Sequence, residues 1–391
     1  MAALSTFATC LLASVAFPQQ PNYPSLVAPY NLDLLTTPAA IVFPEDTSHV
    51  AAAVKCAVDA GIKYNNGCRH TPHGSTFTVG LGGHATVGAA GAASRQLGLL
   101  VDYLEEVEIV LANSSVVRAS KTQNTDLFFA IRGAGSSVGI VTDFAIRTEP
   151  APPSTISYSY IWTGTDPAAR AQVFLSWQSL LASGTLPRNT GFDLVVTPAA
   201  SSQADFDILS HFSGTAPQTT QITPYTNFLE FAAAASARTI ASGTAQPSHF
   251  YAKSLVFKQQ TLIPDSVVHA AFEYLNTTTN GTDLYAITFN GLAFVHRDTL
   301  FFAFSFGRTA GALTDTTIQF LNGLSDVLTS GHPDAYYGQY AGNVDPRESK
   351  EEAWASYAAY YGDNLQRLKK VKAEVDPHDV FHNLQSVQPG Y

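Results

Sequence analysis

The chain has 391 residues, of which 46% are hydrophobic and 13% are charged, and its formal net charge is −10. This length and composition suit two domains or one large two-part fold with a substantial core, and they argue against intrinsic disorder. The acidic balance argues against nucleic-acid binding, which needs clustered Lys and Arg, and no apolar run reaches the roughly 18 residues that span a bilayer.

The first segment, MAALSTFATCLLASVAFPQQ, contains an apolar stretch of the kind found in signal peptides. Because it lacks a positively charged start and includes Cys10, we favour a short amphipathic helix whose Cys10 is bridged to Cys56. None of the three cysteines stands in a CxxC pair, which argues against a zinc site. With Cys10 bridged to Cys56, Cys68 remains as a free thiol. The sequence contains no Ser-His-Asp order and no metal-ligand cluster.

Three N-x-S/T sequons, at Asn113, Asn276 and Asn280, are typical of a secreted glycoprotein. Such sequons also arise by chance in chains rich in Ser and Thr. Although the chain has no clear signal peptide, the sequons favour the secretory pathway or the extracellular space as its location.

In the first part of the chain, strands and helices follow one another. Residues 39–44 are expected to form a short strand, and residues 45–61 an Ala-rich helix. After the glycine run of residues 79–91, residues 99–120 are expected to form strands joined by a tight Asn-Ser-Ser turn. Residues 124–150 predict a capped helix, a glycine turn and a buried strand.

A Pro-rich stretch at residues 149–154 predicts a boundary. Beyond it, strands such as residues 155–162 alternate with helices such as residues 169–184, which indicates an α+β pattern. Residues 284–307 are expected to form two or three strands. A long helix is predicted across residues 348–377, ending at the Asp-Pro pair.

Five stretches, in order along the chain, carry a family resemblance: TPAAIVFPEDTSHVAAAVKCAVDAGIK, HGSTFTVGLGGHATVGAAG, NTDLFFAIRGAGSSVGIVTDF, FVHRD and YYGDNLQRLKKVKAEVDPHDVFHNLQSV. The chain resembles the berberine bridge enzyme-like branch of the vanillyl-alcohol-oxidase type FAD-linked oxidases, and within it the fungal oligosaccharide oxidases. The resemblance implies the PCMH-type flavoprotein fold, with a shortened FAD-binding domain and an antiparallel-sheet substrate domain. The expected parts are residues 1–148 for the first domain, 149–344 for the second, and 345–391 for a segment that returns to the first.

The resemblance also exposes a gap in the cofactor site. In the resembled enzymes a glycine-histidine loop grips the FAD diphosphate, and its histidine and a later cysteine are bonded to the flavin. Here Lys63 and Tyr64 run almost directly into NNGCRHTPHG, and the cysteine position is Thr76. The remaining positions are interpreted as a vestigial cofactor site: Gly80, Gly82, Gly83, His84, Gly88, Gly133, Gly135 and Gly139.

Burying the two phosphate charges of FAD without N–H donors and a helix terminus would cost several kcal/mol. We therefore expect that FAD binding has been lost and that no cofactor is needed. The alternative explanation of the gap is a gene model that omits an exon.

Tyr340, in YYGQYAGNVDP, stands where the resembled enzymes have the tyrosine that deprotonates the sugar hydroxyl. A tyrosine packed at the end of a sheet is an equally good interpretation. Arg297, in FVHRD, is a second candidate hydrogen-bond donor, although this motif more often anchors the sheet.

An apolar pocket is expected next to these catalytic candidates. The strand glutamines of the oligosaccharide oxidases fall at Ala286 and Phe304, and a tryptophan platform falls at Leu284. Sites that bind sugar hydroxyls need polar side chains, so these changes predict a small terpenoid- or polyketide-like substrate. Tyr251 and Lys253 are assigned to the same pocket, with a solvated lysine as the simpler alternative.

Three functions are compatible with these residues. The one we favour is non-redox, flavin-independent ring formation of the hetero-Diels–Alder type, as in similar fungal enzymes of secondary metabolism. The second is a noncovalent FAD-dependent oxidase of an alcohol or carbohydrate, with Tyr340 as base. The third is a vestigial binding protein for an apolar metabolite. The sequence does not determine the oligomeric state.

We expect a Cys10–Cys56 disulfide, since one disulfide and one free thiol are the simplest arrangement of three cysteines. Peptide mapping under non-reducing conditions should recover the two linked peptides as one species. Recovery of both peptides separately, with free thiols, would contradict the pairing.

Overall fold

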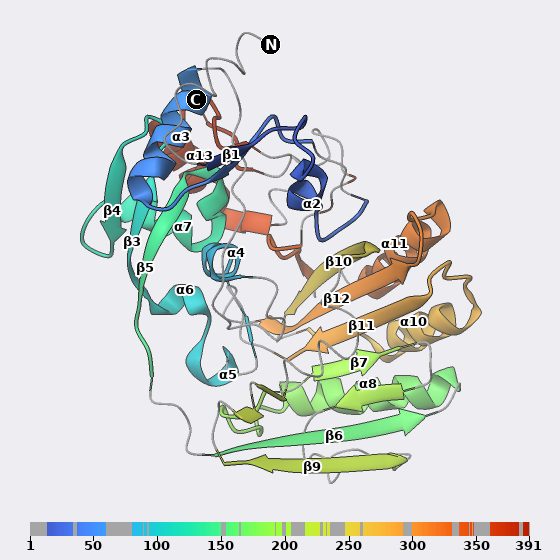
Figure 1. Ribbon diagram of the computed structural model, residues 1–391. Coiled ribbons are helices and arrows are strands. Elements are labelled where there is room, and N and C mark those ends of the chain that lie inside the picture. The colour runs from blue at the N-terminus through green and yellow to red at the C-terminus, as the bar shows by residue number, and fades with distance from the viewer. Residues whose placement is uncertain are drawn as a thin grey trace.

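The computed structural model has two sheet-based parts and a short N-terminal ribbon (Figure 1). It describes residues 14–33, 37–59, 80–88, 90–91, 94–149, 154–163, 166–191, 193–197, 201–204, 216–226, 230–231, 233–234, 247–258, 261–291, 299–330, 336–343, 345, 347, 360–382 and 386–390. Helices combined with antiparallel sheets confirm the expected α+β class.

The smaller sheet has the order β4–β3–β5. Its strands are β3 (Leu104–Val110), β4 (Val116–Ser120) and β5 (Ile140–Ile146). The tight turn predicted between β3 and β4 is present, with Ser114 in the left-handed region at φ 67°. Two helices, α7 (Thr125–Ala134) and α13 (Leu365–Val375), share a core with β3, whereas α3 (Thr47–Asp59) packs in a second core with Val110 and Ile140. Helices from both ends of the chain therefore cover this sheet.

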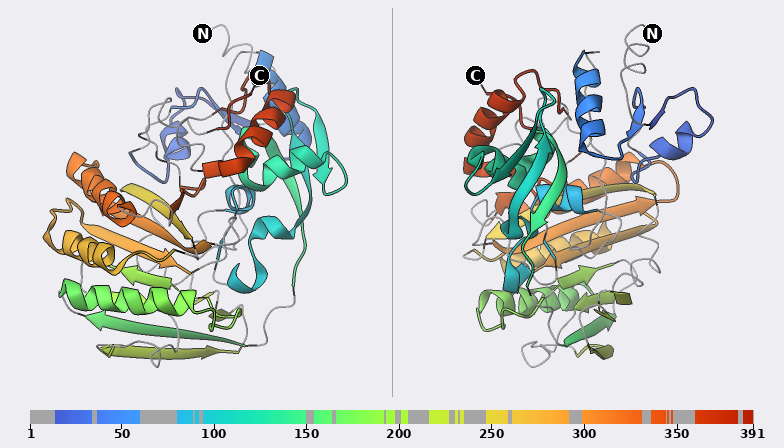
Figure 2. Two further views of the ribbon diagram at one scale, coloured as in Figure 1. Left: turned by 180° about the vertical axis from the view of Figure 1, so that it is seen from behind. Right: turned by 60° about the vertical axis from the view of Figure 1, so that its left-hand side comes forward.

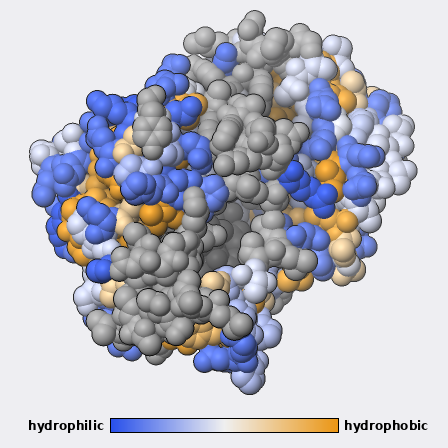
Figure 3. Space-filling model, turned by 90° about the horizontal axis from the view of Figure 1, so that it is seen from above, coloured by the Kyte–Doolittle hydropathy of each residue, from blue (hydrophilic) through white to orange (hydrophobic). Residues whose placement is uncertain are grey.

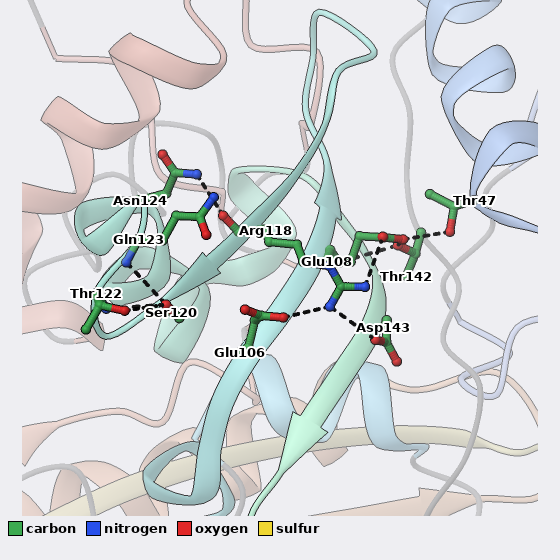
Figure 4. Close-up of polar contacts among 10 residues, drawn as sticks. All are labelled: Thr47, Glu106, Glu108, Arg118, Ser120, Thr122, Gln123, Asn124, Thr142 and Asp143. Atoms are coloured by element: carbon green, nitrogen blue, oxygen red, sulfur yellow. Dashed lines mark hydrogen bonds and ion pairs between the residues drawn. The ribbon is translucent and has the colours of Figure 1, made fainter.

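A polar network ties α3 to the smaller sheet (Figure 4). Glu108 Oε1 accepts hydrogen bonds from Thr47 Oγ1 at 2.8 Å and from Thr142 Oγ1 at 2.9 Å. These two hydrogen bonds hold the pKa of Glu108 below its usual value. Across the strands, Arg118 donates to Glu106 at 2.7 Å and to Glu108 at 3.4 Å. Because Arg118 and Glu106 are largely solvated, their pairing orients the side chains more than it stabilises the fold.

The larger sheet has the order β13–β10–β12–β11–β7–β8–β6–β9, with antiparallel pairing throughout. Its strands are β6 (Thr155–Thr163), β7 (Asp193–Val196), β8 (Ser201–Ala204), β9 (Thr219–Tyr225), β10 (His249–Lys258), β11 (Leu284–Asn290), β12 (Thr299–Thr309) and β13 (Tyr336–Gly338). Figure 2 shows three helices together on one face of the sheet: α8 (Pro167–Ala182), α10 (Asp265–Thr277) and α11 (Asp315–Thr329). Between helices and sheet, Trp177 packs 5.6 Å from Phe174 and 5.1 Å from Phe301, measured between ring centroids.

Local sequence sets where these helices begin. The Asp166 carboxylate accepts hydrogen bonds from the N–H groups of Ala168 and Ala169, and Pro167 occupies the first turn, where its missing N–H is harmless. In the same way, Thr314 accepts from the N–H of Thr317 at the start of α11.

A buried lysine joins the C-terminal segment to the smaller sheet domain. Lys372, on α13, is fully buried, and its Nζ donates to Asp376 Oδ2 at 2.6 Å, to the Ser137 carbonyl at 2.8 Å and to the Phe381 carbonyl at 2.9 Å. The N–H of Val387 donates to Ser137 Oγ at 3.1 Å. These contacts hold Phe381 and Val387 close to η1 (Gly135–Ser137).

Two expectations for the chain ends are corrected. Ser14–Ala16 form strand β1, which pairs with β2 (Ile41–Phe43), where a helix was expected; pairing satisfies their backbone groups across the ribbon. Of the helix predicted across residues 348–377, residues 348–359 lie outside the described residues, and the described part contains the 3₁₀ turn η4 (Gly362–Asn364), where Gly362 has φ 50°. α13 does end before the Asp-Pro pair, as predicted. The shorter helices are α2 (Tyr23–Val27), α4 (Leu81–Thr86), α5 (Ser94–Leu97) and α6 (Leu100–Tyr103).

The described residues also bear on membrane spans, metal sites, surface hydropathy and the cysteines. No helix among the described residues is long and apolar enough to cross a membrane. In the same part of the chain, no three His, Cys, Asp or Glu side chains gather as a metal site. The view from above shows hydrophobic residues in small patches between hydrophilic ones (Figure 3). Cys10 and the side chain of Cys56 lie outside the described residues.

We expect Lys372→Met to lower the free energy of unfolding by about 3–5 kcal/mol, because Asp376 would remain buried without its cation. Urea denaturation measures the change. Lys370→Met, on the exposed side of the same helix, is the matched control and should shift stability by less than about 0.5 kcal/mol. Equal effects from the two variants would contradict a buried ionic contact at Lys372.

Candidate functional site

The larger sheet has one face covered by helices and one face that no described helix covers. β12 lies in the middle of this region, between β10 and β11 (Figure 1). Along β12, Phe302, Phe304 and Phe306 are half-buried and alternate with buried residues that pack toward α8, α10 and α11. Their rings therefore share the uncovered face. Neighbouring ring centroids are 6.4 and 6.3 Å apart, with interplanar angles of 24° and 26°.

Aromatic rings from other segments extend this series at both ends. Phe250, on β10, lies 5.2 Å from Phe306, and Tyr30 lies 5.8 Å from Phe250. At the other end, Tyr340 meets Phe302 edge to face at 5.7 Å. These distances fall within the roughly 4.5–7 Å range of favourable ring pairs. The aromatic row, as we call it, consists of Tyr30, Phe250, Phe306, Phe304, Phe302 and Tyr340.

Three of the five predicted pocket residues lie on the uncovered face. Phe304 belongs to the aromatic row itself. Ala286 pairs directly with Phe306, and Leu284 pairs with Arg308. Directly opposed residues of antiparallel strands point to the same face, with Cβ atoms about 4.5–5.5 Å apart. The side chains at these three positions therefore form one apolar surface with the row.

The other two predicted pocket residues, Tyr251 and Lys253, lie on the helix-covered side of β10. Tyr251 is 2% exposed and belongs to the helix-side core. Its hydroxyl donates to Asp345 Oδ2 at 2.5 Å and lies 3.1 Å from Asn322 Oδ1, and Lys253 Nζ lies 3.2 Å from the same Asp345 oxygen. The sheet thus separates this pair from Phe304, so the five residues do not share one surface.

Tyr340 is held in a tight turn at the end of the row. Its N–H donates to Ser254 Oγ at 3.0 Å, and the N–H of Asn343 donates back to the Tyr340 carbonyl at 2.9 Å. The Tyr340 ring lies over Gly342, where a Cβ would be 2.5 Å from Cε1 of the ring. Arg297, the second catalytic candidate, lies outside the described residues.

Tyr30 places a second phenol at the opposite end of the row. Burial raises the pKa of Tyr30, and the positive charge of Arg308 offsets part of this effect. The Tyr30 hydroxyl is therefore protonated at neutral pH. A phenol thus stands at each end of an otherwise apolar row.

The predicted cofactor glycines prove to have several structural roles. Gly80 and Gly88 have φ values of 79° and 126°, which favour glycine. A Cβ on Gly135 would lie 2.7 Å from Thr86 Cβ, and one on Gly139 would lie 2.6 Å from Ile109 Cδ1. Gly82, Gly83 and His84 belong to α4, in which both glycine carbonyls accept from a threonine hydroxyl and His84 is buried.

Gly133 differs from the packed glycines because a Cβ there would meet nothing within 4 Å. The space beside its Cα is therefore open. Gly135 and Gly139, in contrast, are needed for packing within the domain. Residues 61–79, where the sequence indicates that the diphosphate loop is missing, lie outside the described residues.

Several residues of this face were missed by sequence reasoning. Phe302 and Phe306 could have been found, because aromatic residues at every second position of TLFFAFSFG indicate one face of a strand. Tyr30 and Phe250 are distant in sequence, so no local signal joins them to the row. A separate surface pocket of about 570 Å³, lined by residues including Gln172 of α8, lies on the helix side and does not involve the row.

Comparisons with known proteins give consistent results. Residues 344–388 match the family described as "Berberine and berberine like". The chain is 57% identical to the FAD-linked oxidoreductase sorD of Penicillium rubens, with 100% of both chains covered. It is 27% identical to the xylooligosaccharide oxidase of Thermothelomyces thermophilus, with 93% of this chain and 89% of the relative covered. The structure of xylooligosaccharide oxidase from Myceliophthora thermophila C1 in complex with xylobiose matches with a TM-score of 0.87, 25% identity and 100% coverage of both chains.

We expect Gly342→Ala to lower the free energy of unfolding by about 1–3 kcal/mol, because the added methyl overpacks against the Tyr340 ring. Chemical denaturation measures the loss. Gly311→Ala, where a Cβ would meet nothing within 4 Å, is the control and should change stability by less than about 0.5 kcal/mol. If both variants are equally stable, the ring does not lie over residue 342.

Proposed function

Because this chain belongs to the berberine bridge enzyme-like family of FAD-linked oxidoreductases, we propose that it is a flavin-independent member that joins apolar substrates into a ring without redox chemistry. Its fold is that of the vanillyl-alcohol-oxidase type flavoproteins. The aromatic row is the observation that carries the proposal. Its substrates are small terpenoid- or polyketide-like molecules.

The chemistry of the uncovered face favours such substrates over sugars. Sugar hydroxyls need hydrogen-bond partners when they leave water, and phenyl rings supply none. A flat apolar ligand instead gains about 25 cal/mol for each Å² of apolar surface that it buries on the row. The hydroxyls of Tyr30 and Tyr340 can each bond one polar atom at an end of such a ligand.

Two observations support independence from FAD. The alignment with the Penicillium rubens protein is 473 residues long, whereas this chain has 391, so the relative has residues without a counterpart here. A loop missing after Lys63 would account for part of this difference in length. The packing roles of Gly135 and Gly139 account for these glycines without a phosphate beside them. We therefore derive no step through a flavin.

In the proposed reaction, an enone or quinone methide serves as a four-atom heterodiene and adds to an alkene. One C–C and one C–O bond form, three π bonds become one, and no electron or proton leaves the pair of substrates. The row holds both partners flat and adjacent, and such orientation can lower a bimolecular barrier by about 7–11 kcal/mol. The Tyr340 hydroxyl donates a hydrogen bond to the heterodiene oxygen as its negative charge increases. Arg297 is a second donor in this proposal.

The second candidate is a noncovalent FAD-dependent alcohol oxidase with Tyr340 as base. The name of the Penicillium rubens relative favours it, and so does the open space beside Gly133. In this case Tyr340 would take the proton of the substrate hydroxyl, and a bound flavin would supply the redox chemistry.

A location in the secretory pathway is part of the proposal. Asn113, in the turn between β3 and β4, and Asn276, near the end of α10, are both exposed and belong to sequons. Asn280 is half-buried, and its Oδ1 accepts from the N–H of Thr282. The two exposed asparagines are the better acceptors for glycans.

The test begins with the absorbance of the purified 391-residue protein from 300 to about 550 nm, before and after excess FAD and gel filtration. We expect a folded, colourless protein that converts a quinone methide and an alkene into a product whose mass is the sum of both. Tyr340→Phe should slow this turnover about 10- to 100-fold without unfolding the protein, since one hydrogen bond in the transition state is lost. Tyr274→Phe, which removes a hydroxyl bonded to the Phe320 carbonyl in the helix layer, should leave the rate unchanged.

A flavin band near roughly 450 nm and peroxide formation from alcohols would overturn the proposal in favour of the oxidase. Binding of an apolar ligand without any product would favour a binding protein. A chain that does not fold would indicate that the gap after Lys63 comes from an omitted exon.

A further inference from the structure

The turn that carries Tyr340 runs along an edge of β10. β13 pairs with β10 through Tyr336 and Gly338, opposite Phe257 and Val256, and then ends. Farther along the same edge, the N–H of Tyr340 donates to Ser254 Oγ on the uncovered face. The chain then reaches Asp345, whose contacts with β10 lie on the helix-covered side. Tyr340 and Asp345 thus contact residues on opposite faces of β10.

Hydrogen bonds and an ion pair hold Asp345 on the helix-covered side of β10. It is 5% exposed, and its Oδ2 accepts a hydrogen bond from the Tyr251 hydroxyl at 2.5 Å and lies 3.2 Å from Lys253 Nζ. Its Oδ1 accepts from the N–H of Arg347 at 3.0 Å. A buried carboxylate that loses such partners is strongly disfavoured, so Asp345 has little freedom to leave this position.

Tyr340 has little freedom at the other end of the same turn. Its backbone is tied to Ser254 and Asn343, and its ring fits between Phe302 and the bare Cα of Gly342. Because only four residues separate Tyr340 from Asp345, a shift of the carboxylate changes the path of the turn. The orientation of the ring then changes as well.

We propose that Asp345 is the positioning residue for Tyr340: Lys253 and Tyr251 hold it on the helix-covered side of β10, and it fixes the turn that presents the phenol to the uncovered face. The catalytic consequence rests on the proposed function, whereas the placement of the ring does not. The inference gives Tyr251 and Lys253 a role in the site although they do not touch the aromatic row.

The first experiment reads the position of Tyr340 without any substrate. 3-Fluorotyrosine placed at residue 340 should give a ¹⁹F resonance displaced by the ring current of Phe302, and Phe302→Leu identifies that displacement. Asp345→Asn keeps the size and an acceptor for Arg347 but removes the charge, and it should move the resonance toward its unfolded position or broaden it. Asp166→Asn, which makes the same substitution at the start of α8, is the matched control and should leave the resonance unchanged.

The second experiment is a double-mutant cycle on turnover. Misplacing a reacting group by about 1 Å can cost on the order of 100-fold in rate, so Asp345→Asn should lower kcat at least about tenfold while changing KM less than about threefold. In the Tyr340→Phe background the same substitution should change kcat less than about twofold. Tyr251→Phe keeps the ion pair and should give a smaller shift and loss, and it replaces Asp345→Asn if that variant does not fold.

The outcomes separate this inference from the proposed function. An unmoved ¹⁹F resonance in folded Asp345→Asn or Tyr251→Phe overturns the positioning role, whatever the reaction is. Equal losses of kcat in the Tyr340 and Tyr340→Phe backgrounds also overturn it, because a purely structural effect would act on both. A moved resonance in a protein that converts no substrate pair supports the positioning role while the proposed function fails.

Discussion

The two-residue period of β12 is the constraint on which the larger sheet depends. Phe301, Ala303 and Ser305 point toward the helices, while the residues between them present rings to the other face. Gly307 continues the helix side, where a Cβ would lie 3.2 Å from Leu321 of α11. A slip of one residue in pairing would exchange the two faces and lose both the core and the aromatic row. One strand thus specifies the hydrophobic core and the surface proposed to hold the substrate.

Buried charged side chains connect the C-terminal part of the chain to earlier elements. Lys372 meets Asp376 and the Ser137 carbonyl in the smaller domain, and Asp345 meets Lys253 and Tyr251 in the larger one. Buried ion pairs add little net stability because desolvation offsets their attraction. They do penalise alternative arrangements, since a misplaced partner leaves a bare charge inside the protein. Both contacts therefore suit a segment that must be set in one position.

The residues that maintain the fold differ from those of the surface proposed to hold the substrate. Glycines such as Gly135 and Gly139 are required by the close approach of Thr86 and Ile109, so they remain useful whether or not a cofactor is present. The uncovered sheet face has no comparable structural demand, because its side chains do not fill the helix-side core. Changes there alter the ligand chemistry without disturbing the fold. The fold can therefore be kept while the side chains of the uncovered sheet face change.

The sequence alone determined features that depend on neighbours along the chain. The helix α3, the tight turn after β3, the end of α13 before Asp376 and the alternating phenylalanines of β12 all follow from local composition and period. The resemblance to flavoprotein oxidases came from short motifs of the same local kind. These features could be predicted because capping, backbone strain and side-chain alternation act within a few residues.

Only the tertiary structure decided which face of each strand became the core and which elements met across the sheet. Alternation places Tyr251 and Phe250 on opposite faces of β10, but it does not say which face the helices cover. Tyr30 joins the row, and Ser14–Ala16 form a strand, through contacts with residues far along the chain. Pairing and packing over such separations are selected by the total burial of the folded chain, which no single segment encodes.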